Sequence, residues 1–339
     1  MQNQAVILNV MKDFPFNGSR WILEILRQAQ NDEINGFAKP SIMQERDIQI
    51  RGFKVRIPMD VLMVFSANPE DYTNRGNIIT PLKDRIDAQI LTHYPREIDV
   101  GMEITEQEAW TSREDDLEVS IPALFKRLLE EISFKARSSE YIDQKSGVST
   151  RLTITAMEQL ISSAERRALI NGETKTVARI TDVYHIVPAL TGKLELVYEG
   201  EQEGIINVSK HIIGTAIKKI FTRYFPDPEQ QKKKNTDSAY KPILNWFAEG
   251  NTLEITDQQS QQQYEESLKQ VPGLQDLVRE YTDTPDVETE FTFMDFVIEA
   301  LHQHSILGKE EIHNKRSYSD MLSSMLSSMD DLDNLDDFE

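Results

Sequence analysis

A continuous apolar run, VLMVFSA at residues 61–67, constrains the fold of this chain more than any other feature. An uncharged run of this length is typical of a strand that is buried on both faces of a parallel sheet. In the preceding segment, 46–57, apolar residues alternate with polar ones on both sides of Arg51-Gly52, which predicts a β-hairpin with glycine in its turn. Asn68 and a polar stretch follow the run directly, so an amide is expected at the strand tip.

The apolar period becomes helical from about residue 121 onward. Helices are predicted where apolar residues recur at spacings of three and four. The stripes that carry this prediction are Leu124, Phe125, Leu128, Leu129 and Ile132; Met157, Leu160, Ile161, Ala164 and Ala168; Val208, Ile212, Ala216 and Ile220; and Phe293, Phe296, Val297, Ala300 and Leu301.

Shorter helical features complete this interpretation. Residues 1–11 are interpreted as the end of an amphipathic helix, and a further helix is expected to begin near Thr181 as its N-cap, with Pro188 interrupting it. Glu165-Arg166-Arg167 is expected to form a solvated helix face, with the basic pair as a candidate subunit contact.

The order of these elements predicts an α/β portion followed by an all-α portion. The expected divisions are an incomplete α/β module at 1–98, a helical domain at 99–198, a helical extension at 199–317 and an acidic disordered tail at 318–339. A polar linker is expected at 226–242, within the extension.

Composition excludes several classes of function. The chain has 37 Lys and Arg against 57 Asp and Glu, a net charge of −20, which disfavours a general nucleic-acid binder. No apolar stretch approaches the roughly 18 to 20 residues that span a bilayer, so no membrane association is expected. There is no cysteine, and no signal peptide is recognised, which fits a cytoplasmic protein. The six histidines show no metal-ligand spacing, so no metal site is expected among them.

Two motifs indicate a family. The stretch IQIRGFKVRIPMDVLMVFSANPEDYTNRGNIITPLKDRI, and in particular SANPEDYTNRG with TPLKDRI, resembles the second half of the ATPase module in the magnesium-chelatase (MoxR/chelatase) branch of the AAA+ ATPases. The stretch GVSTRLTI and the helix through SSAERRALING resemble the lid domain of the same group. The resemblance covers about residues 44–198, and also residues 1–11 if the segment between them is skipped.

The resemblance implies a site and an assembly. Asn68 matches sensor 1, whose amide orients the water that attacks ATP, and Arg85 matches the arginine finger that reaches the γ-phosphate held by the next subunit. Arg151 matches sensor 2, at the start of a lid helix, and the hairpin at 46–57 resembles the pre-sensor-1 insertion of this branch. The family implies ATP and Mg²⁺ as cofactors, a homo-oligomeric, usually hexameric ring, and a von Willebrand factor A domain protein as a partner to be remodelled.

Each of these assignments has a plain structural alternative. Asn68 is also a common turn residue, and Arg85 can form a surface ion pair with a neighbouring carboxylate. Arg75 competes with Arg85 for the finger role, and Arg151 can be an ordinary residue of a first helical turn.

The motif that holds the phosphates of ATP is missing. A P-loop reads G-x-x-x-x-G-K-[ST], but Gly192-Lys193 and Gly308-Lys309 are the only Gly-Lys pairs, and neither is followed by Ser or Thr. The acidic pair that should hold Mg²⁺ is missing as well. The chain is therefore expected to be truncated and unable to bind ATP alone, with residues 12–43 as an insertion. Two hypotheses remain open: part of an ATP-hydrolysing ring, or a non-catalytic binding remnant that supplies the finger and the lid.

Overall fold

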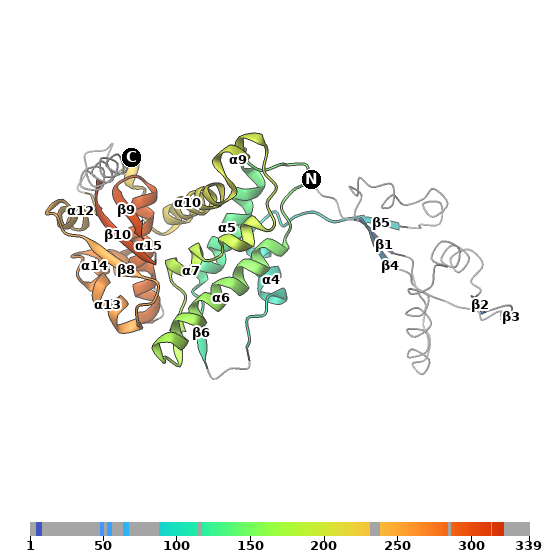
Figure 1. Cartoon of the computed structure of the whole chain (residues 1–339), viewed down its shortest axis with the longest axis horizontal. Coiled ribbons are helices and arrows are strands. Elements are labelled where there is room, and N and C mark those ends of the chain that lie inside the picture. The colour runs from blue at the N-terminus through green and yellow to red at the C-terminus, as the bar shows by residue number, and fades with distance from the viewer. Residues whose placement is uncertain are drawn as a thin grey trace, which may run out of the picture. The chain divides into compact units, whose positions relative to one another are not determined.

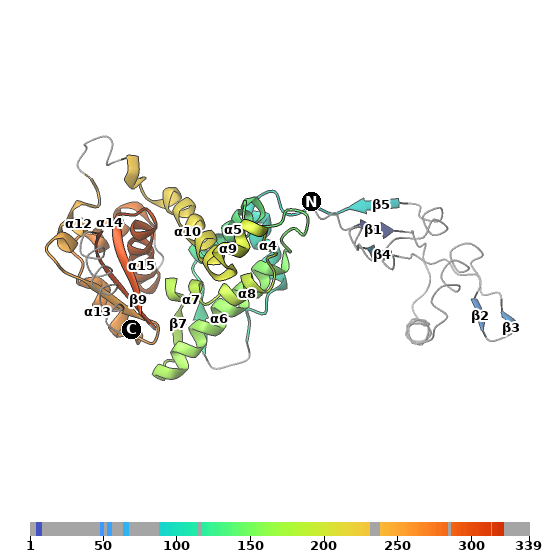
Figure 2. The ribbon, with the colours of Figure 1, turned by 45° about the horizontal axis from the view of Figure 1, so that its top comes forward.

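The computed structural model describes residues 5–8, 48–50, 53–55, 64–67, 88–113, 117–230, 238–283, 286–312 and 314–321. The chain divides into two compact units, Met1–Tyr94 and Pro95–Glu339. Most elements of both units are labelled in Figure 1, and α8 and β7 are labelled in Figure 2. The predicted insertion at 12–43 lies outside the described residues.

The first unit contains two small antiparallel sheets. In the larger one β1 (Ala5–Leu8) pairs with both β4 (Val64–Ala67) and β5 (Ala88–Leu91), in the order β4-β1-β5. Two predictions are therefore wrong: the start of the chain is a strand rather than a helix, and the apolar run contributes to an antiparallel pair rather than a parallel one. A short apolar run occurs both in buried helices and in buried strands. Its periodicity alone does not distinguish these elements.

The predicted hairpin is confirmed. β2 (Ile48–Ile50) pairs with β3 (Phe53–Val55) antiparallel, with Ile48 opposite Val55 and Ile50 opposite Phe53. Arg51-Gly52 are thus the two connecting residues, the loop length that favours a tight hairpin turn.

The second unit is mostly helical. Its helices are α4 (Ile98–Glu108), α5 (Ala123–Ser138), α6 (Arg151–Asn171), α7 (Ile180–Tyr184), α8 (Val187–Thr191), α9 (Tyr198–Glu203), α10 (Ile205–Tyr224), α12 (Lys241–Ala248), α13 (Gln261–Lys269), α14 (Leu274–Tyr281) and α15 (Val287–Gln303). A short parallel pair, β6 (Glu118–Ser120) with β7 (Lys175–Val177), lies beside them. Within the described residues, none of these helices combines the length and the apolar character that crossing a bilayer requires.

The four predicted apolar stripes are confirmed as buried faces of α5, α6, α10 and α15. α10 lies between α5 and α15 (Figure 2), and it packs against both. The ring of Phe221 on α10 lies 5.9 Å from that of Phe296 on α15. The helical layer and the C-terminal layer therefore share one hydrophobic core.

The C-terminal layer contains a sheet that was not predicted. β8 (Leu253–Thr256), β10 (Lys315–Asp320) and β9 (Leu307–Ile312) form an antiparallel sheet in the order β8-β10-β9. The segment 199–317 is therefore not purely helical. The acidic tail does not begin at residue 318 either, because Tyr318 is fully buried in β10.

Two local predictions also need correction. α7 begins at Ile180, so Thr181 is its second residue, and Arg179 occupies the N-cap. Arg167 is not solvated: it is 3% exposed, because it faces Asp182 in the interior. Pro188 does interrupt the helical path as predicted, since α7 ends at Tyr184 and α8 begins at Val187 with proline in its first turn.

Candidate functional site

The residues predicted to contact nucleotide are only partly described. Asn68, Arg85 and the competing Arg75 lie outside the described residues. Arg151 is the first residue of α6 and is exposed. The structure therefore locates one member of the predicted site and does not bring the set together.

The start of α6 positions Arg151 by local hydrogen bonds. The Ser149 hydroxyl accepts from the backbone N–H of Arg151 at 3.2 Å, and the Ser149 carbonyl accepts from Leu152 N–H at 3.0 Å. Val148 is fully buried just before them and anchors the turn. In the described part of the chain, the Arg151 guanidinium forms no ion pair. A free cation at a helix N-terminus favours a negatively charged ligand.

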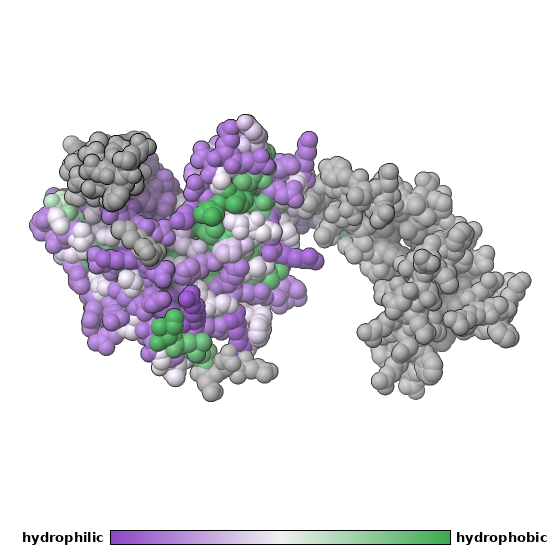
Figure 3. Space-filling view, in the orientation of Figure 1, coloured by the Kyte–Doolittle hydropathy of each residue, from purple (hydrophilic) through white to green (hydrophobic). Residues whose placement is uncertain are grey.

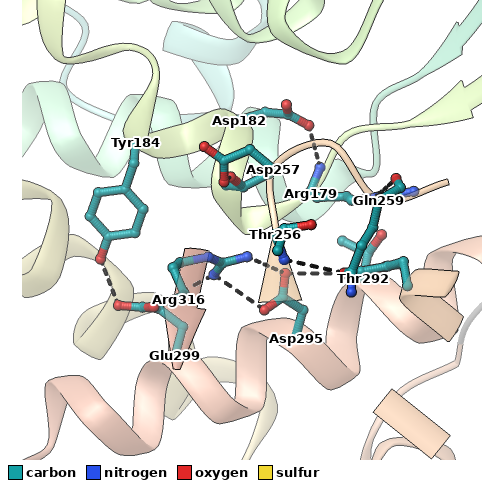
Figure 4. Close-up of polar contacts among 12 residues, drawn as sticks. Arg179, Asp182, Tyr184, Thr256, Asp257, Gln259, Thr292, Asp295, Glu299 and Arg316 are labelled. Carbon is teal, nitrogen blue, oxygen red and sulfur yellow. Dashed lines mark hydrogen bonds and ion pairs between the residues drawn. The ribbon is translucent and has the colours of Figure 1, made fainter. Parts of the chain in front are cut away.

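The most organised polar cluster lies elsewhere, where α6 and α7 meet the C-terminal layer. Much of it is drawn in Figure 4. We call it the buried polar network; its members are Arg167, Arg179, Asp182, Tyr184, Asp295, Glu299, Arg316 and Tyr318.

One half of the buried polar network surrounds Asp182. Its carboxylate accepts from Arg167 Nη1 at 2.7 and 2.8 Å and from the backbone N–H of Arg179 at 2.8 Å. The Arg179 guanidinium stacks 4.1 Å from the Tyr264 ring centroid and donates to the Gln259 carbonyl at 2.8 Å. Burial, reinforced by the nearby Arg167 charge, lowers the pKa of Arg179 to about 10.

The other half surrounds Glu299 on α15. Its carboxylate accepts from the hydroxyls of Tyr184 at 2.6 Å and Tyr318 at 2.5 Å, and from Lys309 Nζ at 3.1 Å. Burial alone would raise the pKa of Glu299, but the charges of Lys309 and Arg316 outweigh it and hold the pKa well below its usual range. Glu299 is therefore an ionised carboxylate in the interior.

Arg316 joins this half to Asp295. Arg316 Nη2 lies 3.3 Å from Asp295 Oδ2, and both side chains are almost fully buried. Asp295 and Glu299 thus face the cations of Arg316 and Lys309, so the charges balance. A buried set of charges is tolerated only when it is paired in this way.

A small hollow opens beside the network, between α7 and the ends of β8 and β10. It encloses about 140 Å³ and is lined by Tyr184, His185, Lys210, Asp257, Glu311 and Arg316, among others. Pockets that hold drug-sized ligands enclose about 300 to 1,000 Å³. The hollow is therefore too small for a nucleotide.

The side chains of a serine, a histidine and an aspartate are joined in a line of polar contacts beside this hollow. Ser163 Oγ lies 2.6 Å from His185 Nδ1, and His185 Nε2 lies 3.3 Å from Asp257 Oδ2. The hydrogen bond with Asp257 raises the pKa of His185. For Asp257, burial acts to raise the pKa, but the hydrogen bonds from His185 and Thr181 outweigh it and lower the pKa.

This line does not form a hydrolytic triad. Ser163 lies in the middle of α6, where the neighbouring backbone N–H groups are used by the helix and cannot form an oxyanion hole. Its hydroxyl also contacts Asp182 Oδ1 at 2.7 Å. The three side chains therefore tie α6, α7 and β8 together rather than activate a nucleophile.

The described residues offer no group of three or more metal-ligating side chains. The buried polar network was not predicted from the sequence, because its members are spread from residue 167 to residue 318 and each alone resembles an ordinary surface polar residue. One signal was present: charges at 290, 295 and 299 interrupt the apolar stripe of α15, and such charges inside a buried helix need partners.

Comparison of the chain with protein-family models, curated proteins and solved structures finds no match to any of them. The class that the fold defines is a mixed α and β protein with a mainly helical second unit and sheets of two or three strands.

Proposed function

We propose that this chain is part of a magnesium-chelatase-like AAA+ ATPase and contributes Asn68, Arg85 and Arg151 to ATP sites in a ring. In this proposal the ring couples ATP hydrolysis to the remodelling of a partner protein. These 339 residues contain no P-loop, so the ATP that Arg85 reaches is held by a neighbouring subunit.

The observation that carries the proposal is the placement of Arg151. Its guanidinium is exposed at the first residue of a 21-residue helix and has no ion-pair partner in the described ranges, although the chain has 57 acidic residues. A sensor 2 arginine has to stay available for phosphate.

Sequence supports the other two roles. SANPEDYTNRG puts Asn68 directly after β4, and TPLKDRI puts Arg85 shortly before β5. An arginine finger stabilises the charge that spreads over the transferred phosphoryl group and contributes about 10³- to 10⁵-fold to the rate in related reactions.

A complementation assay tests the proposal. The purified chain is mixed with a magnesium-chelatase ATPase subunit that has an intact P-loop and its own arginine finger changed to alanine. Mixed assembly is measured by mass photometry and phosphate release by a coupled assay with Mg²⁺-ATP. We expect mixed rings that recover ATP hydrolysis and loss of this recovery in Arg85→Ala.

Arg166→Ala is the control, because Arg166 is an exposed arginine with no predicted contact to nucleotide. It should leave the recovered hydrolysis unchanged. If no mixed assembly forms, the ring proposal is wrong. If mixed rings form but hydrolysis does not depend on Arg85, the chain acts as a non-catalytic binding module instead.

A further inference from the structure

α10 and the segment after it are basic in an otherwise acidic chain. Residues 205–242 contain eight Lys and Arg and three Asp and Glu, a net +5, whereas the chain as a whole has 37 basic and 57 acidic residues, a net −20. Such an asymmetry creates a local positive potential that attracts acidic segments.

Three of these cations lie on the outer side of the second half of α10. We call Lys218, Lys219 and Arg223 the cationic stripe. Lys219 and Arg223 are exposed and Lys218 is partly exposed, whereas Ile217, Ile220 and Phe221 point into the core. Within the described part of the chain, no carboxylate forms an ion pair with any of the three. Lys210, about two turns earlier than the stripe, is by contrast paired with Glu311 of β9 at 3.1 Å.

The described chain ends in the sheet beside α15, the helix that packs against α10. The Phe221 ring of α10 lies 5.8 Å from the ring of His304, which ends α15. Leu307, three residues later, begins β9 and pairs with Asp320, the last residue of β10.

The residues that follow are acidic and contain no basic side chain. The 18 residues from 322 to 339 include six carboxylates: Asp330, Asp331, Asp333, Asp336, Asp337 and Glu339. A chain of that length reaches about 60 Å when extended, which far exceeds the two turns of helix that the stripe occupies.

We propose that the cationic stripe of α10 is the docking surface for the acidic C-terminal segment 330–339 of the same molecule. Charge complementarity favours this occupant, and the 18 residues from 322 onward are long enough to reach the stripe. The segment would cover the only outward face of α10 that carries three unpaired cations among the described residues, and it would compete with any acidic partner protein for that face.

Zero-length carbodiimide cross-linking of the full chain tests this proposal. The reagent joins a lysine amine to a carboxylate in contact with it, and mass spectrometry maps the linked pairs. Lys145 is the reference, since it is an exposed lysine remote in sequence from the stripe and has no ion pair in the described ranges. Cross-links from 330–339 to Lys219 should exceed those to Lys145 by about tenfold. This is the increase in the docked population expected from the combined free energy of three exposed ion pairs.

Arg223→Gln separates docking from chemical reactivity, because arginine does not react with the reagent and both lysines are retained. This variant should reduce the Lys219 cross-links severalfold, whereas Arg166→Gln should not change them. In 1 M NaCl, where the screening length falls to about 3 Å, the preference for Lys219 should disappear.

Three results would overturn the proposal. Equal cross-linking of Lys219 and Lys145 would mean that the segment does not dock. A preference that survives both Arg223→Gln and high salt would mean that charge does not direct it. Cross-links between isotopically labelled and unlabelled chains, instead of within one chain, would assign the surface to a second copy.

Discussion

Arg167 on α6 and Asp182 on α7 form a bidentate ion pair in the interior of the second unit. Arg167 Nη1 donates to both carboxylate oxygens at 2.7 and 2.8 Å, and the two side chains are 2% and 0% exposed. Arg167 Nη2 also donates to the Val177 carbonyl at 2.8 Å. One guanidinium therefore holds α6, α7 and β7 together.

Removal of one partner should be strongly destabilising. Asp182→Asn leaves the Arg167 charge buried without its counter-charge, and we expect a loss of about 3 to 5 kcal/mol in the free energy of unfolding. Urea unfolding followed by circular dichroism measures it. Glu265→Gln is the control, because Glu265 pairs with the half-exposed Lys269 one helical turn away and such a pair contributes only about 0.3 to 0.5 kcal/mol. Equal effects of the two changes would contradict the buried ion pair.

Glu130 provides a prediction with a defined pH dependence. Its carboxyl is 2% exposed and accepts from the Thr105 hydroxyl at 2.6 Å. Burial raises its pKa, against the hydrogen bonds from Thr105 and Thr153 that act to lower it. Ionisation of Glu130 is therefore less favourable in the folded state than in the unfolded state. The resulting loss of stability grows as the pH rises from 4.5, the pKa of the unfolded state, through the raised pKa of the folded state.

Glu130→Gln should therefore stabilise the protein at neutral pH. Glutamine resembles the protonated acid and keeps an acceptor for Thr105, so the variant avoids the ionisation penalty. We expect a higher melting temperature than wild type at pH 7 and a difference that vanishes near pH 4, measured by calorimetry at both pH values. A variant that is less stable than wild type at pH 7 would show that the ionised carboxylate is favoured.

Gly200 in α9 should not tolerate a side chain. A Cβ at this position would lie 2.6 Å from the Tyr141 carbonyl oxygen, a backbone atom that cannot turn away. Alanine in a helix normally gains about 1 kcal/mol over glycine. Gly200→Ala should instead destabilise, whereas Gly192→Ala, whose nearest contact would be an ordinary 3.4 Å, should be neutral or better. Chemical unfolding of both variants tests the difference, and a stabilising Gly200→Ala would refute the close approach.

The helical core was predictable because the buried residues of each helix form a periodic pattern within one short segment of sequence. Stripes such as Leu124, Leu128 and Ile132 repeat at the helical period, and the structure buries them all. The hairpin at 48–55 was predictable for the same reason, since alternation and a glycine turn lie within one short segment.

The C-terminal sheet escaped prediction because its inward residues are not all apolar. In β10 the buried positions are Arg316 and Tyr318. Burial therefore alternates along the strand as expected, but the sequence shows no alternation of apolar and polar residues. The interior accepts Arg316 only because Asp295 and Glu299 lie opposite, more than fifteen residues earlier in the chain. A pattern confined to one segment cannot reveal such pairing. Of the predicted nucleotide-binding residues, Arg151 alone lies in the described ranges, and its role stays a prediction.

His185 gives the last prediction, because its charge links α7 to the end of β8. The hydrogen bond to Asp257 raises the pKa of His185, and the nearby Asp182 acts in the same direction, whereas burial and Arg166 oppose it. Lys210, Glu311, Lys315 and Arg316 line the same hollow.

A histidine whose pKa is raised by folding stabilises the protein when it is protonated. This stabilisation is fully present below 6.5, the pKa of the unfolded state, and is lost as the pH rises through the pKa of the folded state. We therefore expect wild type to be more stable than His185→Gln at pH 6, with the difference shrinking as the pH rises above 7. The effect should be modest, because the His185 side chain is 44% exposed and solvent screens its charge. NMR titration provides the direct measurement: the pKa of His185 should fall in Asp257→Asn. An unchanged His185 pKa in that variant would mean that Asp257 does not hold the proton on the ring, and the link between α7 and β8 would then be independent of pH.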